Sequence, residues 1–204
     1  MNKLYGLRFS AGTRKVIWAL EEAGRPFELI PVDVTKGDQR KPEFLALNPN
    51  GTIPTLVDDE GPLWECNAIL LHLADRVEAL APANARTRSE TAQWLFWEIT
   101  SLGDSLHRAW LQKFFAARGR PLDAEEHERQ VRAAEKPLGV LDAWLKDRPY
   151  VVGERFGVAD IACGASVAQS AMAEISLTRY PAVARWFSRV SSRPAYARIE
   201  GAEA

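Results

Sequence analysis

The residues with the clearest chemical potential lie in the first third of the chain. Ser10 belongs to the polar turn Ser10-Ala11-Gly12-Thr13, which separates a predicted strand from a predicted helix. The first N–H groups of a helix have no partner within it and attract anions. A hydroxyl at that place can add one more hydrogen-bond donor for an anion. The alternative is that Ser10 or Thr13 only caps the helix.

A second group stands at the start of another predicted helix, where Glu65 precedes Cys66. The N-terminus of this helix offers free N–H groups that favour an anion, and Glu65 places a carboxylate beside them. A thiol is a weaker hydrogen-bond donor than a hydroxyl, so Cys66 offers less to an anion than a serine would. The alternative is a first helical turn with a favourable acid and no ligand.

Two loops add polar and rigid residues. The loop at 37–43 contains Gln39 and Arg40, and arginine pairs well with carboxylates. A solvated basic loop is the competing interpretation. The segment Asn48-Pro49-Asn50-Gly51-Thr52-Ile53-Pro54 combines turn residues with a proline that directly precedes a predicted strand.

The composition excludes several classes of protein. The 204 residues are 47% hydrophobic and carry a net charge of -1, which indicates a globular chain and not a nucleic-acid binder. We find neither an apolar run of membrane-spanning length nor a signal peptide. The three histidines, His72, His107 and His127, share no metal-ligand spacing, so no metal site is expected. Two cysteines, Cys66 and Cys163, favour a reducing cytoplasm over a disulfide framework.

Short alternating elements must position the first group of residues. Hydrophobic spacing predicts strands at 3–7, 27–32, 55–57 and 63–64, and helices at 14–23, 42–47 and 66–77. Gly24 follows the first helix as a helix-stopping glycine. The first strand–helix–strand unit favours two parallel strands joined by a right-handed crossover.

Longer helices follow a predicted linker at 79–87, which separates a domain at 1–78 from one at 88–204. Helices are predicted at 88–116, 124–145, 158–173 and 180–191. Pro137 should kink or interrupt the second of them. In Gly157-Val158-Ala159-Asp160-Ile161, the Asp160 carboxylate can reach back to the helix N-terminus, which indicates a folding role. Gly157 cannot supply the other half of this capping box.

The order of the elements and these motifs resemble the cytosolic glutathione transferases, and the resemblance covers nearly the whole chain. The family has an α/β thioredoxin-like N-terminal domain and an all-α C-terminal domain. The segment 48–54 matches the family pattern Asn-Pro-x-Gly-x-(Val/Ile)-Pro, whose last proline is cis. Glu65-Cys66-Asn67-Ala68-Ile69 is similar to the family's Glu-Ser-x-Ala-Ile, with Cys66 in place of serine. A bacterial, Ser-type, theta- or phi-like member is implied.

The resemblance implies glutathione as co-substrate and no metal. Ser10 is then the catalytic residue, whose hydroxyl donates to the glutathione sulfur. The implied glutathione-binding residues are Gln39, Arg40, Ile53, Pro54, Glu65 and Cys66. Among them, the Ile53 backbone would pair with the cysteinyl unit, as an added strand does. Tyr5 is a second hydroxyl candidate, although its place inside a strand favours packing.

For the second substrate the resemblance implies a small hydrophobic electrophile, held by the strand–helix loop and the helical domain. The candidate residues are Phe9, Trp97, Ser101, Asp104 and His107. The last four are expected to share one helix face. Aromatic residues at these places also suit the core or a dimer contact.

The implied protein is a cytoplasmic, homodimeric glutathione transferase without nucleic-acid or membrane partners. The loop 48–51 carries no aromatic residue to lock the dimer, so we expect a comparatively polar interface that includes Arg86, Arg88, Trp94 and Trp97. A non-catalytic or regulatory protein on the same fold is the main alternative. Isomerase or peroxidase chemistry from the same thiolate is another. The loop at Ser10 has no cysteine, which argues against the disulfide-reducing branches of the family.

Overall fold

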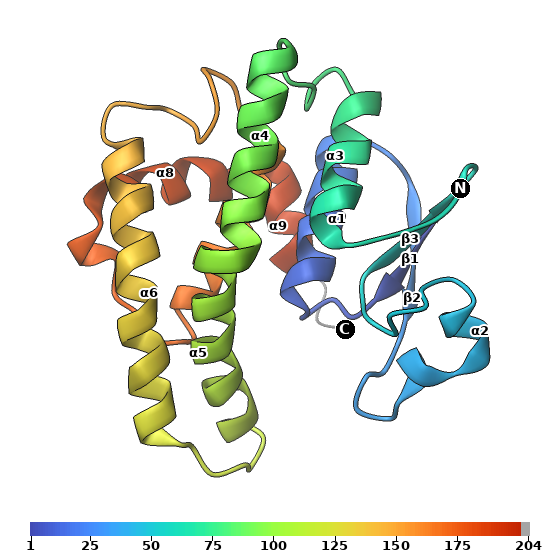
Figure 1. Ribbon diagram of the computed structural model, residues 1–204, viewed down its shortest axis with the longest axis horizontal. Helices are drawn as coiled ribbons and strands as arrows, with labels where there is room; N and C mark the ends of the chain where they lie inside the picture. Colours follow the sequence, from blue (N-terminus) through green and yellow to red (C-terminus); the bar gives the residue numbers. More distant parts are fainter. Residues whose placement is uncertain (201–204) are drawn as a thin grey trace. The chain divides into compact units, whose positions relative to one another are not determined.

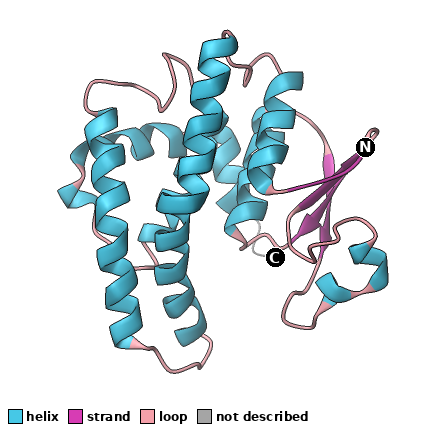
Figure 2. Cartoon of the chain, in the orientation of Figure 1, coloured by secondary structure: helices cyan, strands magenta, loops and turns pink. Residues whose placement is uncertain are grey.

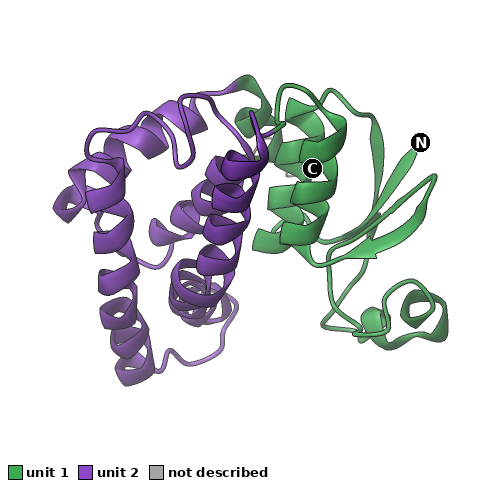
Figure 3. Cartoon of the chain, turned by 45° about the horizontal axis from the view of Figure 1, so that its top comes forward, with its two compact units in different colours: residues 1–81, 194–204 green, residues 82–193 purple. Residues whose placement is uncertain are grey.

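The computed structural model describes residues 1–200. The chain forms two compact units, which Figure 3 shows in different colours. Unit 1 comprises residues 1–81 together with the helix that begins at Pro194, and unit 2 comprises residues 82–193.

Unit 1 is built on a four-stranded sheet with the strand order β2-β1-β3-β4 (Figure 1). The strands are β1 (Asn2–Gly6), β2 (Phe27–Pro31), β3 (Thr55–Asp58) and β4 (Gly61–Trp64). β1 pairs with β2 in parallel, as predicted, and with β3 in antiparallel orientation. β3 and β4 are antiparallel neighbours joined by a tight turn.

The helices of unit 1 are α1 (Ala11–Glu22), α2 (Pro42–Leu45), α3 (Cys66–Arg76) and α9 (Pro194–Glu200), with the 3-10 turn η1 (Asp38–Arg40) before α2. α1 packs against both α3 and α9, and Figure 1 shows α1 and α3 side by side. Val16, Leu20 and Leu70 are completely buried in this layer. Trp18 of α1 meets Tyr196 of α9 edge to face, with ring centroids 4.8 Å apart. α9 is an element that the sequence patterns did not predict.

Unit 2 is helical throughout its regular structure (Figure 2). Its elements are α4 (Ala85–Trp97), the π-helical turn η2 (Glu98–Leu102), α5 (Gly103–Ala116), α6 (Ala124–Leu145), α7 (Val158–Val167), the 3-10 turns η3 (Ala168–Ser170) and η4 (Leu177–Arg179), and α8 (Pro181–Ser191). Every residue of α7 is buried, and α7 packs against α4, α5 and α8. The expected fold, a thioredoxin-like α/β domain plus an all-α domain, is confirmed.

Two details of the helix predictions are wrong, and a third is wrong in part. The single helix predicted at 88–116 is divided by η2, where the N–H of Gly103 donates to the carbonyl of Glu98 and so adds one residue to the turn. The helix predicted at 158–173 ends at Val167 and continues as a 3-10 turn. Pro137 does not interrupt α6, so of the two predicted effects the break is wrong and the kink stays a prediction. The nearby Ala134 and Leu138 are completely buried, so packing holds the helix together.

Asp160 fixes the start of α7. One carboxylate oxygen accepts hydrogen bonds from the Val151 N–H (2.9 Å) and the Trp186 Nε1–H (2.8 Å), and the other accepts from the Gly157 N–H (3.0 Å). The residue is 1% exposed. Burial raises the pKa of Asp160 to about 6, although the three N–H donors act in the opposite direction. The predicted folding role of Asp160 is confirmed.

Among residues 1–200, no helix combines the length and the apolar character needed to cross a bilayer.

Candidate functional site

Three of the predicted motifs meet at Gly12, in the first turn of α1. A Cβ atom added there would lie 3.0 Å from Cδ of Pro54 and 3.7 Å from both Cβ and Sγ of Cys66. A separation of 3.0 Å is closer than ordinary carbon contacts, so the absence of a side chain is what allows the approach. The start of α1, the loop before β3 and the first residue of α3 therefore surround one point of unit 1.

The loop before β3 contains a cis peptide bond between Ile53 and Pro54. The amide of Asn48, which is completely buried, ties this loop together. Its Nδ2 donates to the Thr52 carbonyl at 2.7 Å and to the Thr55 hydroxyl at 3.2 Å, and its Oδ1 accepts from the Asn50 N–H at 3.0 Å. Asn48 was part of the sequence motif, but no role had been predicted for it.

The loop that carries Gln39 and Arg40 packs against the same segment. A Cβ atom at Gly51, whose φ is +62°, would lie 3.0 Å from the carbonyl oxygen of Gln39. Glycine is thus required there both by conformation and by space. The Gln39 amide nitrogen donates to the Val34 carbonyl at 3.4 Å, while its buried Oε1 accepts no hydrogen bond from residues 1–200. The exposed guanidinium of Arg40 has no partner within the same range.

Glu65 occupies an unusual backbone conformation at the N-cap of α3, with φ of 71° and ψ of 110°. For a residue other than glycine such a conformation costs about 1–3 kcal/mol and is typical of ligand-binding sites. Its carbonyl accepts the N–H of Ile69 at 3.0 Å, and its side chain is exposed and caps nothing. The carboxylate therefore projects from the start of the helix.

Cys66, the first residue of α3, is 7% exposed. Its thiol donates towards Oδ1 of Asn67 at 3.8 Å, and its sulfur lies 4.0 Å from Nζ of Lys15. Lys15 is 2% exposed and was not among the predicted site residues. The sequence around Lys15 has ordinary helical spacing, so no pattern in it predicts that this lysine is buried beside the Cys66 sulfur.

Ser10 is the N-cap residue of α1, and its carbonyl accepts the Arg14 N–H at 2.9 Å. Its half-buried hydroxyl makes no capping hydrogen bond. The Thr13 hydroxyl is buried next to Gly6 and has no hydrogen-bond partner in the described chain. The interpretation of either hydroxyl as a helix cap is therefore wrong. Tyr5 lies in β1 and packs edge to face on Phe44, with centroids 6.2 Å apart.

The candidates for the electrophile site have different neighbours. Phe9, in unit 1, is 44% exposed. In unit 2, Trp97 lines a groove between α4 and α6, Asp104 forms an exposed ion pair with Arg108, and His107 lies 3.3 Å from Gln169 of η3. Ser101 lies within η2. The extra residue of this turn changes the helical spacing between Trp97 and the residues that follow, so the regular spacing behind the predicted common face does not hold there, and the common face stays a prediction.

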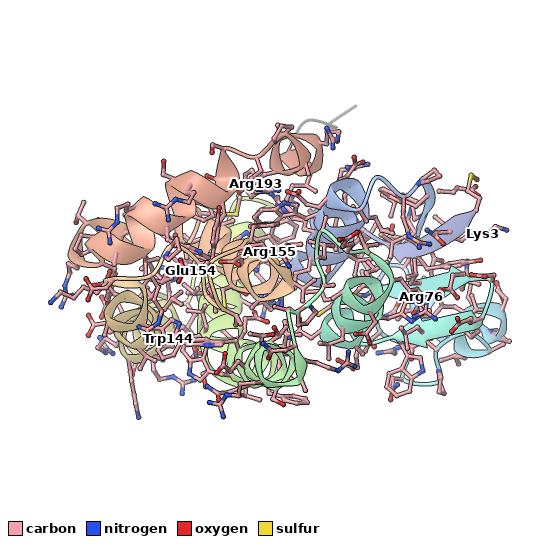
Figure 4. The ribbon with its side chains drawn as sticks, turned by 90° about the horizontal axis from the view of Figure 1, so that it is seen from above. Lys3, Arg76, Trp144, Glu154, Arg155 and Arg193 are labelled. Carbon is pink, nitrogen blue, oxygen red and sulfur yellow. The ribbon has the colours of Figure 1, made fainter. Side chains whose placement is uncertain are left out.

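The groove between α4 and α6 is apolar and has a volume of about 520 Å³. Trp94 contacts both Trp97 and Trp144, with ring centroids 4.9 and 5.2 Å apart. The Arg148 guanidinium lies 3.8 Å from the centroid of the Trp144 ring. Figure 4 labels Trp144 on α6. The described residues contain no group of three or more metal-ligating side chains placed to hold an ion.

Comparisons with known proteins agree with this geometry. Residues 2–75 match the model of the glutathione S-transferase N-terminal domain, and residues 100–194 match that of the C-terminal domain. Disulfide-bond oxidoreductase YfcG of Escherichia coli (strain K12) is 37% identical over 188 residues, which cover 89% of this chain and 86% of YfcG.

Solved structures give the same result. A glutathione S-transferase from Pseudomonas fluorescens Pf-5 superimposes with a TM-score of 0.88 at 36% identity, over 95% of this chain and 96% of that one. A glutathione transferase family member from the same organism, with two glutathione bound, gives 0.84 at 34% identity over 97% and 91%. Because both domain models match and relatives of this similarity span nearly the whole chain, the protein belongs to the glutathione S-transferase family.

Proposed function

We propose that the protein is a glutathione transferase of the Ser type, which binds reduced glutathione on unit 1 and adds it to a hydrophobic electrophile. The observation that carries the proposal is the meeting of three segments at Gly12: the first turn of α1, cis-Pro54 and the start of α3. Together they offer a strand edge and two helix N-termini to one peptide-sized ligand.

Each part of glutathione has a candidate partner. Residue pairing between β3 and β1 begins at Thr55, so the backbone of Ile53 lies outside the ladder and can pair with the cysteinyl unit. The start of α3 suits the γ-glutamyl carboxylate, and the projecting Glu65 carboxylate suits the ammonium beside it. Arg40 and the amide of Gln39 suit the glycine carboxylate.

Ser10 is proposed as the residue that activates the sulfur. A free thiol has a pKa of ~8.5, so little of it is thiolate at neutral pH. A hydrogen bond from the Ser10 hydroxyl to the sulfur favours the thiolate, and the N-terminus of α1 acts in the same direction. The thiolate then attacks an electrophilic carbon, a C–S bond forms, and the leaving group departs with the electron pair of the broken bond.

Disulfide reduction is the second candidate function, and the similarity to YfcG favours it. The same bound thiolate would attack one sulfur of a disulfide and release the other as a thiol. A second glutathione would then attack the glutathione sulfur of the mixed disulfide, so that its S–S bond breaks, the remaining half of the substrate leaves as a second thiol, and glutathione disulfide is formed. The loop at Ser10 has no cysteine, which argues against this chemistry. The similarity to YfcG, which is named a disulfide-bond oxidoreductase, argues for it.

A cytoplasmic homodimer is also proposed. Arg86 already forms an ion pair with Glu90 of its own helix, 2.7 Å apart. The groove lined by Trp94, Trp97 and Trp144 offers a second copy of the chain an apolar surface to cover.

The function is tested by two assays on one preparation. Retention on immobilised glutathione tests binding, and turnover of glutathione with an aromatic halide or with a small aliphatic disulfide separates the two chemistries. We expect retention and conjugation of the halide. Faster turnover of the disulfide would favour the second candidate, and retention without either turnover would leave only a glutathione-binding protein. Ser192→Ala, on the exposed end of α8, is the matched control for Ser10→Ala.

A further inference from the structure

A cleft on unit 1 gathers arginine side chains from three separate segments. It lies where the end of α1, the start of β2 and α9 meet, and it has a volume of about 540 Å³. Its charged lining residues are Arg8, Arg25, Arg198 and Glu21. Among the described residues, three guanidinium groups face one carboxylate, so this lining carries an excess of positive charge.

Arg25 is fixed at the edge of this cleft by the turn that ends α1. Gly24, with φ of +59°, donates its N–H to the Glu21 carbonyl at 3.2 Å, and the Arg25 N–H donates to the Leu20 carbonyl at 3.0 Å. These two bonds form a Schellman motif, which sets the direction of the chain after the helix. Within residues 1–200 the exposed Arg25 guanidinium has no hydrogen-bond or ion-pair partner.

The other two arginines are held by α9 and α1. Arg198 forms an ion pair with Glu21, and its guanidinium also lies 3.5 Å from the Glu21 carbonyl. The Arg8 guanidinium donates to the Arg198 carbonyl at 3.4 Å, so it approaches the end of α9 without meeting a carboxylate. Among the described residues that line the cleft, Glu21 is thus the one carboxylate, and Arg198 already uses it.

Arg8 also acts on Arg14 of α1, which is not part of the lining. Burial lowers the pKa of Arg14, the phenol of Tyr196 opposes this shift, and repulsion from Arg8 adds to it. Repulsion between guanidinium groups is relieved when an anion binds between them. Leu20, Phe27 and Leu29 complete the lining and offer contact to a short carbon skeleton.

We propose that this cleft binds a small organic dianion, either a dicarboxylate or a phosphate monoester. Both classes present two negative charges to planar guanidinium groups, which bind carboxylate and phosphate oxygens in pairs. The volume suits a small molecule. Glu21 and Arg25 lie at the end of α1 opposite to Ser10, while Arg8 reaches the cleft from the loop before α1. The proposal does not depend on the proposed glutathione chemistry.

Titration calorimetry at fixed ionic strength tests the proposal with defined probes. Succinate is compared with succinamide, and phenyl phosphate with phenol, in the presence of saturating reduced glutathione. We expect one-to-one binding of at least one dianion, about tenfold tighter than its uncharged analogue, since a charge-assisted hydrogen bond contributes at least that factor. The better dianion identifies the class of ligand.

Three variants locate the binding. Arg25→Gln changes an exposed side chain and should weaken the binding of the dianion about tenfold. Arg132→Gln, an exposed arginine of α6 that pairs with Glu128, is the matched control and should change nothing. Arg40→Gln should weaken the binding of glutathione and leave the affinity for the dianion unchanged. Failure of the glutathione proposal can therefore be told apart from failure of the dianion proposal. Equal binding of the dianions and their uncharged analogues, or equal affinities of the Arg25 and Arg132 variants, would overturn the proposal.

Discussion

Unit 1 and unit 2 differ in how their candidate functional residues are held. In unit 1 the candidate residues are positioned by backbone geometry. Its features are the cis peptide bond before Pro54, the positive φ of Glu65 and the close approaches at Gly12 and Gly51. In unit 2 the candidates lie along helices, where the register of one turn decides which way a side chain faces. A site fixed by backbone geometry leaves short motifs in the sequence, whereas a site fixed by helical register leaves only spacing.

Asp160 is the exception to this difference between the units, because it belongs to a short sequence motif, residues 157–161, although it lies in unit 2. Asp160→Ala leaves the N–H groups of Val151, Gly157 and Trp186 without their acceptor. We expect the free energy of unfolding to fall by about 3–4 kcal/mol. Urea unfolding followed by tryptophan fluorescence measures it, because five of the seven tryptophans belong to unit 2. Asp147→Ala is the exposed control, and a loss below about 1 kcal/mol in the Asp160 variant would contradict the role.

The same carboxyl should make the stability of the protein depend on pH. Burial raises the pKa of Asp160 from 3.8 to about 6, so between these values the folded state holds a proton that the unfolded chain has released. The contribution of Asp160 to the free energy of unfolding therefore falls as the pH rises through this window, by up to about 3 kcal/mol, and is constant above it. Asp160→Asn does not titrate. The stability difference between wild type and this variant should shrink between pH 4 and pH 6.5, and a constant difference would refute the shift.

In unit 1 the largest expected effect is on turnover and not on stability. Ser10→Ala removes the proposed donor to the sulfur, and we expect kcat to fall by about 10- to 1000-fold, or about 1–4 kcal/mol. The KM for glutathione should change little, because Ile53 and Glu65 are proposed to carry binding. Steady-state kinetics with an aromatic halide measure both constants. Full activity in this variant would transfer the role to another hydroxyl, with Tyr5 and Thr13 as candidates.

Assembly tests the surface of unit 2. Val140 is 44% exposed in the groove of α4 and α6. If a second copy covers that groove, Val140→Asp buries a charge, and the dissociation constant of the dimer should rise about 10- to 100-fold. Sedimentation at low and high ionic strength measures it and shows whether salt weakens the wild-type dimer, as a polar interface requires. Leu122→Asp is the control outside the groove. A wild-type monomer at micromolar concentration in low salt would end the dimer proposal.

The smallest expected effect concerns Cys66. Cys66→Ser restores the hydroxyl of the family motif, so glutathione affinity should stay the same or improve by about 1 kcal/mol, the contribution of one neutral hydrogen bond. Titration calorimetry with glutathione decides this. A large loss of affinity would show that the thiol, which lies between Lys15 and Asn67, has a role that the family pattern does not describe.

The contrast between the units also explains what could be predicted from the sequence. The strands, α1, α3 and α6 follow hydrophobic spacing and were predicted within a few residues. The π turn η2 was not predicted, because the residues Glu98–Leu102 keep ordinary helical spacing. The feature that accompanies the turn is the close approach of Gly103 to the Glu98 carboxylate, which only the structure shows. The approach of Gly12 to Pro54 and Cys66 joins segments far apart in the chain, and spacing along the chain carries no record of it.

The π turn has a consequence for comparing this chain with its relatives. A Cβ at Gly103 would lie 2.5 Å from Oε1 of Glu98 and 3.3 Å from the Ser166 hydroxyl, so the bulge is held by one buried carboxylate and one glycine. Such a turn holds one residue more than an α-helical turn, so the residues after it are shifted by one position in helical register relative to those before it. A relative with a one-residue deletion between Glu98 and Leu102 could therefore place α4 and α5 as this chain does. A one-residue gap at this place in the aligned sequence of a relative would indicate that the relative has a regular α-helix there. Side chains after the gap are then equivalent when the alignment is continued from Gly103.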